Sequence, residues 1–381
     1  LTRERFDALM PQEFWREVVD RVAVEAPGTL LLAEAFWLME GYFVRTLGMH
    51  RVYNSAFMNM MRDEQNANYR SVIKNTIEFD PDILSRYVNF MNNPDERTAV
   101  DQFGRGEKYF GVCALLATLP GLPMIGHGQL EGFEEKYGME FRRANRIEPV
   151  DQGLLAEHAR RIAPLLRRRH LFSGSRHFRL YDCHRDDGHV NEDVLVYSNR
   201  DGDARAVIAY HNRHSEARGW IRVSAAFAEK HADGSRPLRR ESLADALALD
   251  PAIPFVRCRD LVTGLEHLLR TRDLFERGLR LELGPYGSCL LLDWTPIAAD
   301  GRPWDALCDA LGGRGVRDLD DLARLSPGLT LNHQSATGAN QISIRGVAST
   351  AGAGTTGVYI DDTPIQVRNL GFGAGNAMPE L

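Results

Sequence analysis

The chain has 381 residues, of which 44% are hydrophobic and 26% charged, so it carries enough apolar side chains for a large core. Its formal net charge is −6, no basic stripe indicates nucleic acid as a partner, and no block of Lys or Arg indicates an anionic membrane. The five cysteines are scattered without a CxxC pair, and no stretch has the roughly 20 apolar residues of a membrane span. We therefore expect no metal, no cofactor and no transmembrane segment.

Up to about residue 150, apolar strand-like runs alternate with helical patterns. The apolar spacing predicts helices over 11–25 and 106–118. Strands are expected over 30–33, 51–54, 87–91 and 121–126. Such alternation is typical of parallel strands joined by right-handed crossovers. Four units do not close a β/α barrel, which has eight strands.

Two carboxylates follow strand-like runs directly. Leu30-Leu31-Leu32-Ala33 ends at Glu34, which predicts a buried strand with one acid at its C-terminal tip. Asp95 lies in the polar cluster 92–96, after the third run. The C-terminal ends of parallel strands are where α/β enzymes place their chemistry. The alternative for Glu34 is a solvated residue that only ends the strand.

Beyond residue 150 the pattern changes. Residues 155–170 form a basic helix, for which we expect a solvated face, and residues 215–275 are interpreted as a charged helical insertion. Alternating runs separated by turn residues predict antiparallel strands over 177–181, 193–197, 204–210, 279–283 and 288–294. Two short helical patterns fall within 304–325, followed by short β-type runs at 341–345 and 357–360.

Over roughly residues 1–315 the chain resembles the α-amylase family of glycoside hydrolases. The segment Leu32-Ala33-Glu34-Ala35-Phe36-Trp37 is similar to that family's fifth-strand motif. The segment at 90–96, FMNNPDE, is similar to its seventh-strand motif, and residues 121–132 to its eighth. The resemblance implies strands five to eight of a (β/α)8 TIM barrel over residues 1–150. An antiparallel β-sandwich-like domain with a helical insertion would follow over 151–315.

The same resemblance implies a retaining α-glycosidase acting on an α-glucan or another oligosaccharide. Glu34 would be the general acid/base and Asp95 the transition-state stabiliser. An apolar surround from 30–32 and 36–37 would raise the pKa of Glu34. The substrate contacts implied are Asn93, Trp37, Tyr42 and Gln129. Trp37 and Tyr42 have barrel-rim packing as their alternative role.

Two positions depart from the family pattern. Pro94 replaces a histidine, and the nucleophilic Asp expected after an Arg-x on the preceding strand has no counterpart. Arg5-Phe6-Asp7 has that spacing, but no apolar run leads into it. We therefore expect half a barrel without its nucleophile. Its open strand edges, 28–34 and 121–127, would then promote self-association.

Residues 318–381 resemble the plug domain of TonB-dependent outer-membrane receptors, through segments 321–329, 342–347 and 356–365. We expect residues 316–381 to be a truncated, small α/β plug-like segment. The glycosidase part implies a soluble cytoplasmic protein, and only the plug-like part implies the outer membrane or periplasm. A receptor or binding module remains an alternative function, as does a fusion or truncation product without activity.

Overall fold

The computed structural model describes residues 2–35, 39–136, 142–298 and 302–324, together with short strands between 329 and 376. The chain divides into two compact units. The first comprises Leu1–Ala248 and Arg277–Leu290, and the second Leu249–Glu276 and Leu291–Leu381. Our division at residues 150 and 315 remains a prediction.

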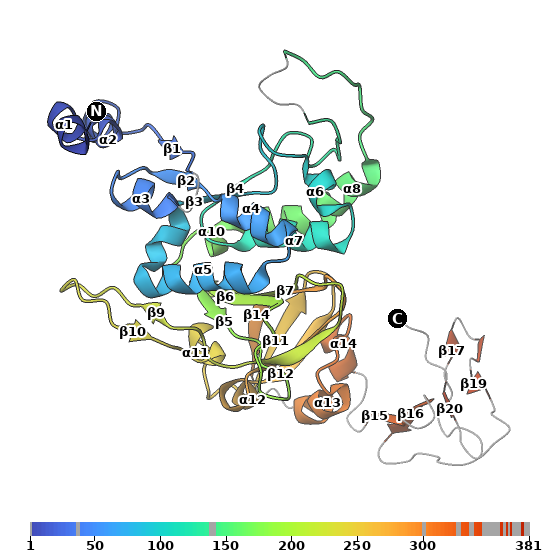
Figure 1. Ribbon diagram of the computed structural model, residues 1–381. Coiled ribbons are helices and arrows are strands. Elements are labelled where there is room, and N and C mark those ends of the chain that lie inside the picture. Colours follow the sequence, from blue (N-terminus) through green and yellow to red (C-terminus); the bar gives the residue numbers. More distant parts are fainter. Residues whose placement is uncertain are drawn as a thin grey trace. The chain divides into compact units, whose positions relative to one another are not determined.

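A parallel four-stranded sheet opens the first unit (Figure 1). Its order is β1 (Leu32–Ala33), β2 (Arg51–Tyr53), β3 (Tyr87–Phe90), β4 (Leu122–Met124). All three pairings are parallel, as the alternation of strands and helices predicted. The helices of this region are α1 (Arg3–Leu9), α2 (Phe14–Glu25), α3 (Glu40–Arg45), α4 (Ser55–Arg62), α5 (Asn66–Phe79), η1 (Pro81–Arg86), α6 (Ala99–Phe103) and α7 (Glu107–Thr118).

One face of this sheet forms a core cluster with the helices. Ala33 of β1 and Val52 of β2 are buried there together with Val19 of α2. Because side chains alternate along a strand, the residues that follow Ala33 and Val52 project to the opposite face. These residues are Glu34 and Tyr53.

The expected burial of the first strand is wrong. β1 has only two residues, Leu30 is 57% exposed and Leu32 is 42% exposed. The physical reason is that only one face of β1 is covered: Ala33 lies in the core cluster, whereas Leu32 projects to the opposite face. A strand covered on one face alternates between buried and exposed residues, whatever its hydrophobicity.

The rest of the first unit is largely antiparallel, as the alternating runs predicted. β5 (Arg179–Tyr181), β6 (Val194–Asp201) and β7 (Ala204–His211) pair in sequence, and β8 (Ala217–Ile221) pairs with β13 (Leu279–Leu283). Helices α5 and α7 lie against β6 and β7 (Figure 1). A Cβ at Gly111 of α7 would lie 2.0 Å from Cε2 of Tyr210, so a glycine is needed where α7 meets β7.

Residues 215–275 contain more strand than helix, so the predicted helical insertion is wrong. Besides β8, they form β9 (Phe227–Ala228), β10 (Leu238–Arg239), α11 (Leu243–Ala246), β11 (Phe255–Asp260), β12 (Glu266–Arg270) and part of α12 (Thr271–Glu276). In β11, Val256 and Cys258 are buried while the arginines that follow each of them are not. The charged side chains therefore recur at every second residue, which is the repeat of a strand.

The basic helix is broken into α8 (Gln152–Glu157), the π-helical η2 (His158–Ile162), α9 (Ala163–Leu166) and α10 (Arg169–Phe172). Its face is not simply solvated. Arg161 is buried and donates two hydrogen bonds to Glu107, at 2.9 and 2.8 Å. Arg169 donates to the backbone carbonyls of Ala117 and Leu119 at 2.6 and 3.1 Å, and to that of Gly121. Arg169 thus satisfies carbonyls at and beyond the end of α7, which a local charge pattern cannot show.

In the second unit, β11 pairs antiparallel with β12 and with residues 291–297 of β14 (Ser288–Ile297). The predicted pair of short helices is present as α13 (Trp304–Leu311) and α14 (Leu319–Arg324), and both contribute to one core cluster. The short strands that follow are β15 (Leu329–Gln334), β16 (Ala339–Ile344), β17 (Tyr359–Ile360), β18 (Thr363–Pro364), β19 (Gln366–Val367) and β20 (Gly375–Asn376). β16 and β17 overlap the two runs predicted from sequence.

Candidate functional site

Glu34 and Tyr53 are in register on neighbouring strands at the C-terminal end of the parallel sheet. Ala33 is in register with Val52, so the next residue on each strand is Glu34 on β1 and Tyr53 on β2. Both project away from the α2 side of the sheet, as described above. Glu34 is exposed, and the Tyr53 ring lies edge-on to that of Phe90 on β3, with centroids 5.3 Å apart.

Asp95 lies in the loop after β3, and Asn93 shapes that loop. Oδ1 of Asn93 accepts hydrogen bonds from the backbone N–H groups of Asp95 and Glu96, at 3.0 and 2.9 Å. This turn leaves the Asp95 side chain exposed while Asn93 is only 9% exposed. With its Oδ1 held by the backbone, Asn93 acts here as a turn residue that positions Asp95.

Tyr53 is the residue on which both carboxylates act. Burial raises the pKa of Tyr53, and the negative charges of Glu34 and Asp95 raise it further. An effect from both charges requires both to be near the phenol. The sequence analysis did not select Tyr53, because its place beside Glu34 depends on the register of β1 with β2.

Gln129, which the resemblance implied as a substrate contact, lies in a buried environment. Its side chain is 1% exposed. Oε1 accepts the Gly126 N–H at 3.1 Å, and Nε2 lies 3.5 Å from Sδ of Met91 and 3.7 Å from Sγ of Cys113. These contacts hold the loop after β4 from within the core, so we do not include Gln129 in the proposed site.

The remaining predicted residues have less definite surroundings. Tyr42 is 38% exposed on α3, with its ring edge-on to Phe43 at 6.0 Å. Trp37 lies outside the described residues, as does Phe36. Leu30 and Leu32 are exposed, so they do not provide the apolar surround expected for Glu34.

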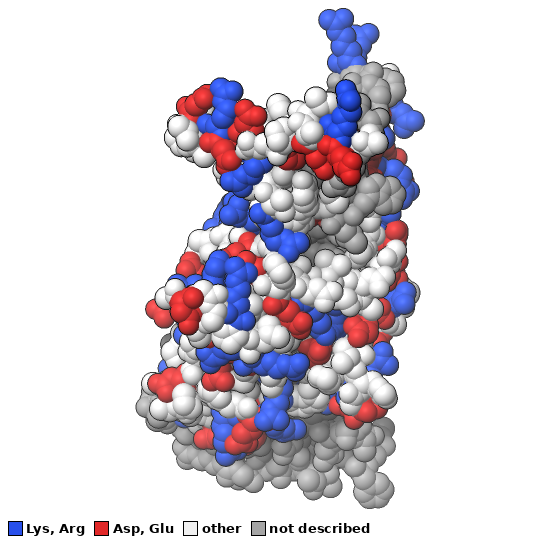
Figure 2. Space-filling model, turned by 60° about the vertical axis from the view of Figure 1, so that its left-hand side comes forward, with Lys and Arg blue, Asp and Glu red and all other residues white. Residues whose placement is uncertain are grey.

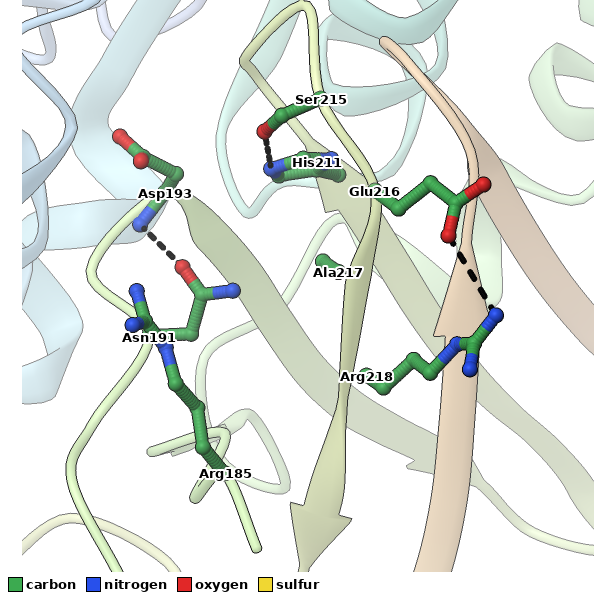
Figure 3. Close-up of a pocket in the computed structure, with 8 residues that line it drawn as sticks. All are labelled: Arg185, Asn191, Asp193, His211, Ser215, Glu216, Ala217 and Arg218. Carbon is green, nitrogen blue, oxygen red and sulfur yellow. Dashed lines mark hydrogen bonds and ion pairs between the residues drawn. The ribbon is translucent and has the colours of Figure 1, made fainter. Parts of the chain in front are cut away.

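A separate polar pocket of about 260 Å³ lies among the antiparallel strands (Figure 3). The ring of His211 is 1% exposed, and its Nδ1 lies 3.2 Å from the Gly284 carbonyl oxygen. Its Nε2 is 3.5 Å from Oγ of Ser215, a long contact at the limit for a hydrogen bond. Arg218 pairs with Glu216 at 3.3 Å across the same pocket. The pocket is therefore polar and largely balanced in charge.

Other kinds of site receive no support from the described residues. Within those ranges, no group of three or more His, Cys, Asp or Glu side chains could hold a metal ion. No helix in the described part of the chain is long and apolar enough to cross a bilayer. On the face shown in Figure 2, acidic and basic side chains are intermixed, so no charge of one sign covers it.

The comparisons with known proteins identify the two parts of the chain separately. Residues 309–379 match the family model of the TonB-dependent Receptor Plug Domain. Curated proteins give no match. Among solved structures, the chain resembles a debranching enzyme from Nostoc punctiforme in its native form, with a TM-score of 0.52 and 16% identity over 75% of this chain and 56% of that one. An Anoxybacillus α-amylase gives a TM-score of 0.50 and 14% identity, over 75% and 56%.

At 14–16% identity these likenesses show a fold. It is an α/β fold similar to the catalytic and β-domains of amylases, as the motif resemblance predicted. A crystal of the Nostoc enzyme soaked with acarbose gives a TM-score of 0.50 at 16% identity, over 75% of this chain and 55% of that one. The chain spans little more than half the length of the structures it matches.

Proposed function

We propose that residues 1–315 are part of a retaining glycoside hydrolase of the α-amylase type, comprising the second half of its (β/α)8 barrel and the β-domain that follows. Glu34 is the general acid/base and Asp95 the transition-state stabiliser. The arrangement at the C-terminal end of the sheet carries this proposal: Glu34 follows β1, Tyr53 ends the neighbouring β2, and Asp95 lies in the loop after β3. That is the end where parallel α/β folds place their catalytic groups.

The chemistry follows from these positions. Glu34 protonates the glycosidic oxygen of the leaving sugar and afterwards takes a proton from the attacking water. Asp95, as a carboxylate, stabilises positive charge that develops on the sugar ring. Tyr53 is protonated at neutral pH, as a tyrosine with an ordinary or raised pKa is, so its hydroxyl can donate a hydrogen bond to either carboxylate. Tyr53 is thus a positioning residue in this proposal.

We further propose that the chain provides two of the three carboxylates of such an enzyme. The acidic residues that precede Glu34 lie on α1 or α2, or directly before α2. None of them follows a strand in the described part of the chain. We expect this chain alone to hydrolyse α-glucans at least ~10³-fold more slowly than an intact relative, which is the order of loss when a catalytic group is removed.

Titration of the chain with acarbose, by calorimetry, tests the site itself. We expect acarbose to bind, and Asp95→Asn and Glu34→Gln each to weaken binding by about tenfold, because each removes a charged hydrogen-bonding partner. Glu96→Gln is the matched control, since Glu96 is adjacent to Asp95 but its charge acts on Arg62 and not on Tyr53. Unchanged affinity in both active-site variants would refute the assignment. Rapid turnover abolished by Glu34→Gln would support the acid/base role but refute the missing nucleophile.

A second candidate function rests on the family match at residues 309–379: a plug-like binding module. Such a module has to fold, and β15 and β16 form its longest paired strands among the described residues. Hydrogen exchange on the whole chain measures this. Amide protection in both strands supports a folded module, whereas exchange at the rate of an unstructured peptide would exclude it.

A further inference from the structure

A second cavity, of about 520 Å³, lies beside the start of β5 and the end of β6 in the first unit. Arg176 and His177 come from the loop before β5, Arg179 from β5 and Arg200 from β6. Together with Lys230, five basic side chains therefore line one cavity. Glu34, Tyr53 and Asp95 do not line this cavity.

Arg200 has an unused donor in this cavity. Its Nη2 donates to Nδ1 of His177 at 3.4 Å. Because a guanidinium can only donate, His177 accepts at Nδ1 and carries its proton on Nε2. The Nε–H of Arg200 is buried and has no hydrogen-bond partner among the described residues. A buried donor without a partner is costly, so a shift of the Arg200 side chain that brings this N–H to a ligand oxygen in the cavity would be favoured.

Arg176 is the second available cation. Its side chain is exposed and forms no hydrogen bond or ion pair with another described residue. The pKa of His177 lies below its usual range, first because of burial and then because Arg200, Arg179 and Arg176 are all close to it. Three guanidinium groups therefore gather around one neutral imidazole.

Arg179 holds this arrangement in place. Its side chain is only 9% exposed, and it pairs with Glu241 at 2.8 Å. It also donates to the backbone carbonyls of Arg176 and Phe178, at 3.0 and 2.9 Å, and lies over the ring of Phe227 at 3.6 Å. The loop that carries Arg176 and His177 is thus fixed to the cavity wall.

Most carboxylates around the cavity already have cations of their own. The pairs are Asp80–Arg236 at 3.0 Å, Asp82–Lys230 at 3.2 Å, Glu229–Arg239 at 2.7 Å and Glu241–Arg179 at 2.8 Å. Asp245 instead accepts the hydroxyl of Ser242 at 2.6 Å. Among the described residues, the guanidinium groups of Arg176 and Arg200 thus have no carboxylate partner. Asp245 is the one lining carboxylate among them without a cation partner.

We propose that this cavity binds a phosphoryl group through Arg200, Arg176 and Nε2 of His177. This is a function beyond the proposed glycosidase site and does not depend on it. Two guanidinium groups and an imidazole N–H offer more donors than a carboxylate needs, whereas the three terminal oxygens of a phosphate can use them together. The phosphoryl group can belong to free phosphate or to a phosphorylated sugar, since both present the same oxygens.

The test is calorimetric titration of the whole chain with inorganic phosphate and, separately, with glucose 6-phosphate, each up to about 10 mM, tenfold above a millimolar dissociation constant. We expect binding, and a loss of about tenfold or more in affinity in Arg200→Gln and in Arg176→Gln. Arg185→Gln is the matched control: Arg185 is also an exposed arginine whose side chain has no hydrogen-bond or ion-pair partner among the described residues, but it lines the other pocket (Figure 3).

The outcomes separate clearly. Tighter binding of glucose 6-phosphate than of phosphate supports a sugar phosphate as the ligand, and equal binding supports free phosphate. A shift of the His177 imidazole signals on phosphate addition, measured by NMR, locates the ligand even if Arg200→Gln lowers stability. Absence of binding by either probe would overturn the proposal. So would a loss in Arg185→Gln equal to that in Arg200→Gln.

Discussion

Arg70→Met should destabilise the first unit strongly, because Arg70 joins α5 to the antiparallel region. Its side chain is 2% exposed and donates from Nη1 to the backbone carbonyls of Asn191 and Val194, both at 3.0 Å. It also forms an ion pair with Asp182. Methionine would fill most of the space but leave both carbonyls without this donor. Breaking a buried, hydrogen-bonded ion pair costs about 3–5 kcal/mol.

We expect a value near the lower end, about 3 kcal/mol, because Asp182 is 24% exposed and keeps Lys74 at 2.7 Å. For a unit of this size that corresponds to a fall of about 6–12 °C in Tm. Urea and thermal unfolding followed by circular dichroism measure both quantities. Lys74→Met is the matched control: it removes the half-exposed partner of the same carboxylate and should cost only about 0.5–1 kcal/mol. Equal losses in the two variants would refute the reasoning.

Three further predictions concern other parts of the first unit. Burial lowers the pKa of His158 to about 4, so its contribution to stability is complete above about pH 6.5 and is lost as the pH falls toward 4. Between about pH 7 and 4.5, the free energy of unfolding should therefore fall by about 2–3 kcal/mol less in His158→Gln than in the unmodified chain. An unchanged pH profile would contradict this. Gly111→Ala should cost about 1–3 kcal/mol in chemical denaturation, because its Cβ would overlap the Tyr210 ring, while Gly174→Ala, with no atom within 4 Å, should be nearly neutral. Similar losses of unfolding free energy in Gly111→Ala and Gly174→Ala would contradict this, because they would show that α7 can move away from Tyr210. Finally, β1 and β4 end the parallel sheet with Leu32 and Leu122 each 42% exposed, so we expect self-association that Leu122→Lys reduces. Light scattering that shows a monomer at every concentration would refute the edge argument.

The positions of Glu34 and Asp95 after strands could be predicted from sequence, but their neighbours could not. The apolar run before Glu34 marked the strand, and alternation with helices indicated its parallel partners. Tyr53 became relevant only through the register of β1 with β2. Gln129 shows the reverse case. Its place after a glycine-rich strand resembled a site residue, yet contacts with Met91 and Cys113 bury it.

The alternation of helices and strands, the antiparallel strands after residue 177 and the plug-like segment could be predicted from sequence, because each depends on periodicity or on a motif within a few neighbouring residues. Which polar groups are buried and what they contact could be learned only from the folded chain. Arg161, which a charge pattern places in solvent, pairs with Glu107, and Arg70 bonds to Asp182, 112 residues away. The contacts of Arg200 on β6 depend in the same way on a distant segment. Its Nη2 donates to His177 in the loop before β5, while its Nε–H has no partner among the described residues. Burial and charge pairing are properties of contacts between distant segments, and a local pattern does not contain them.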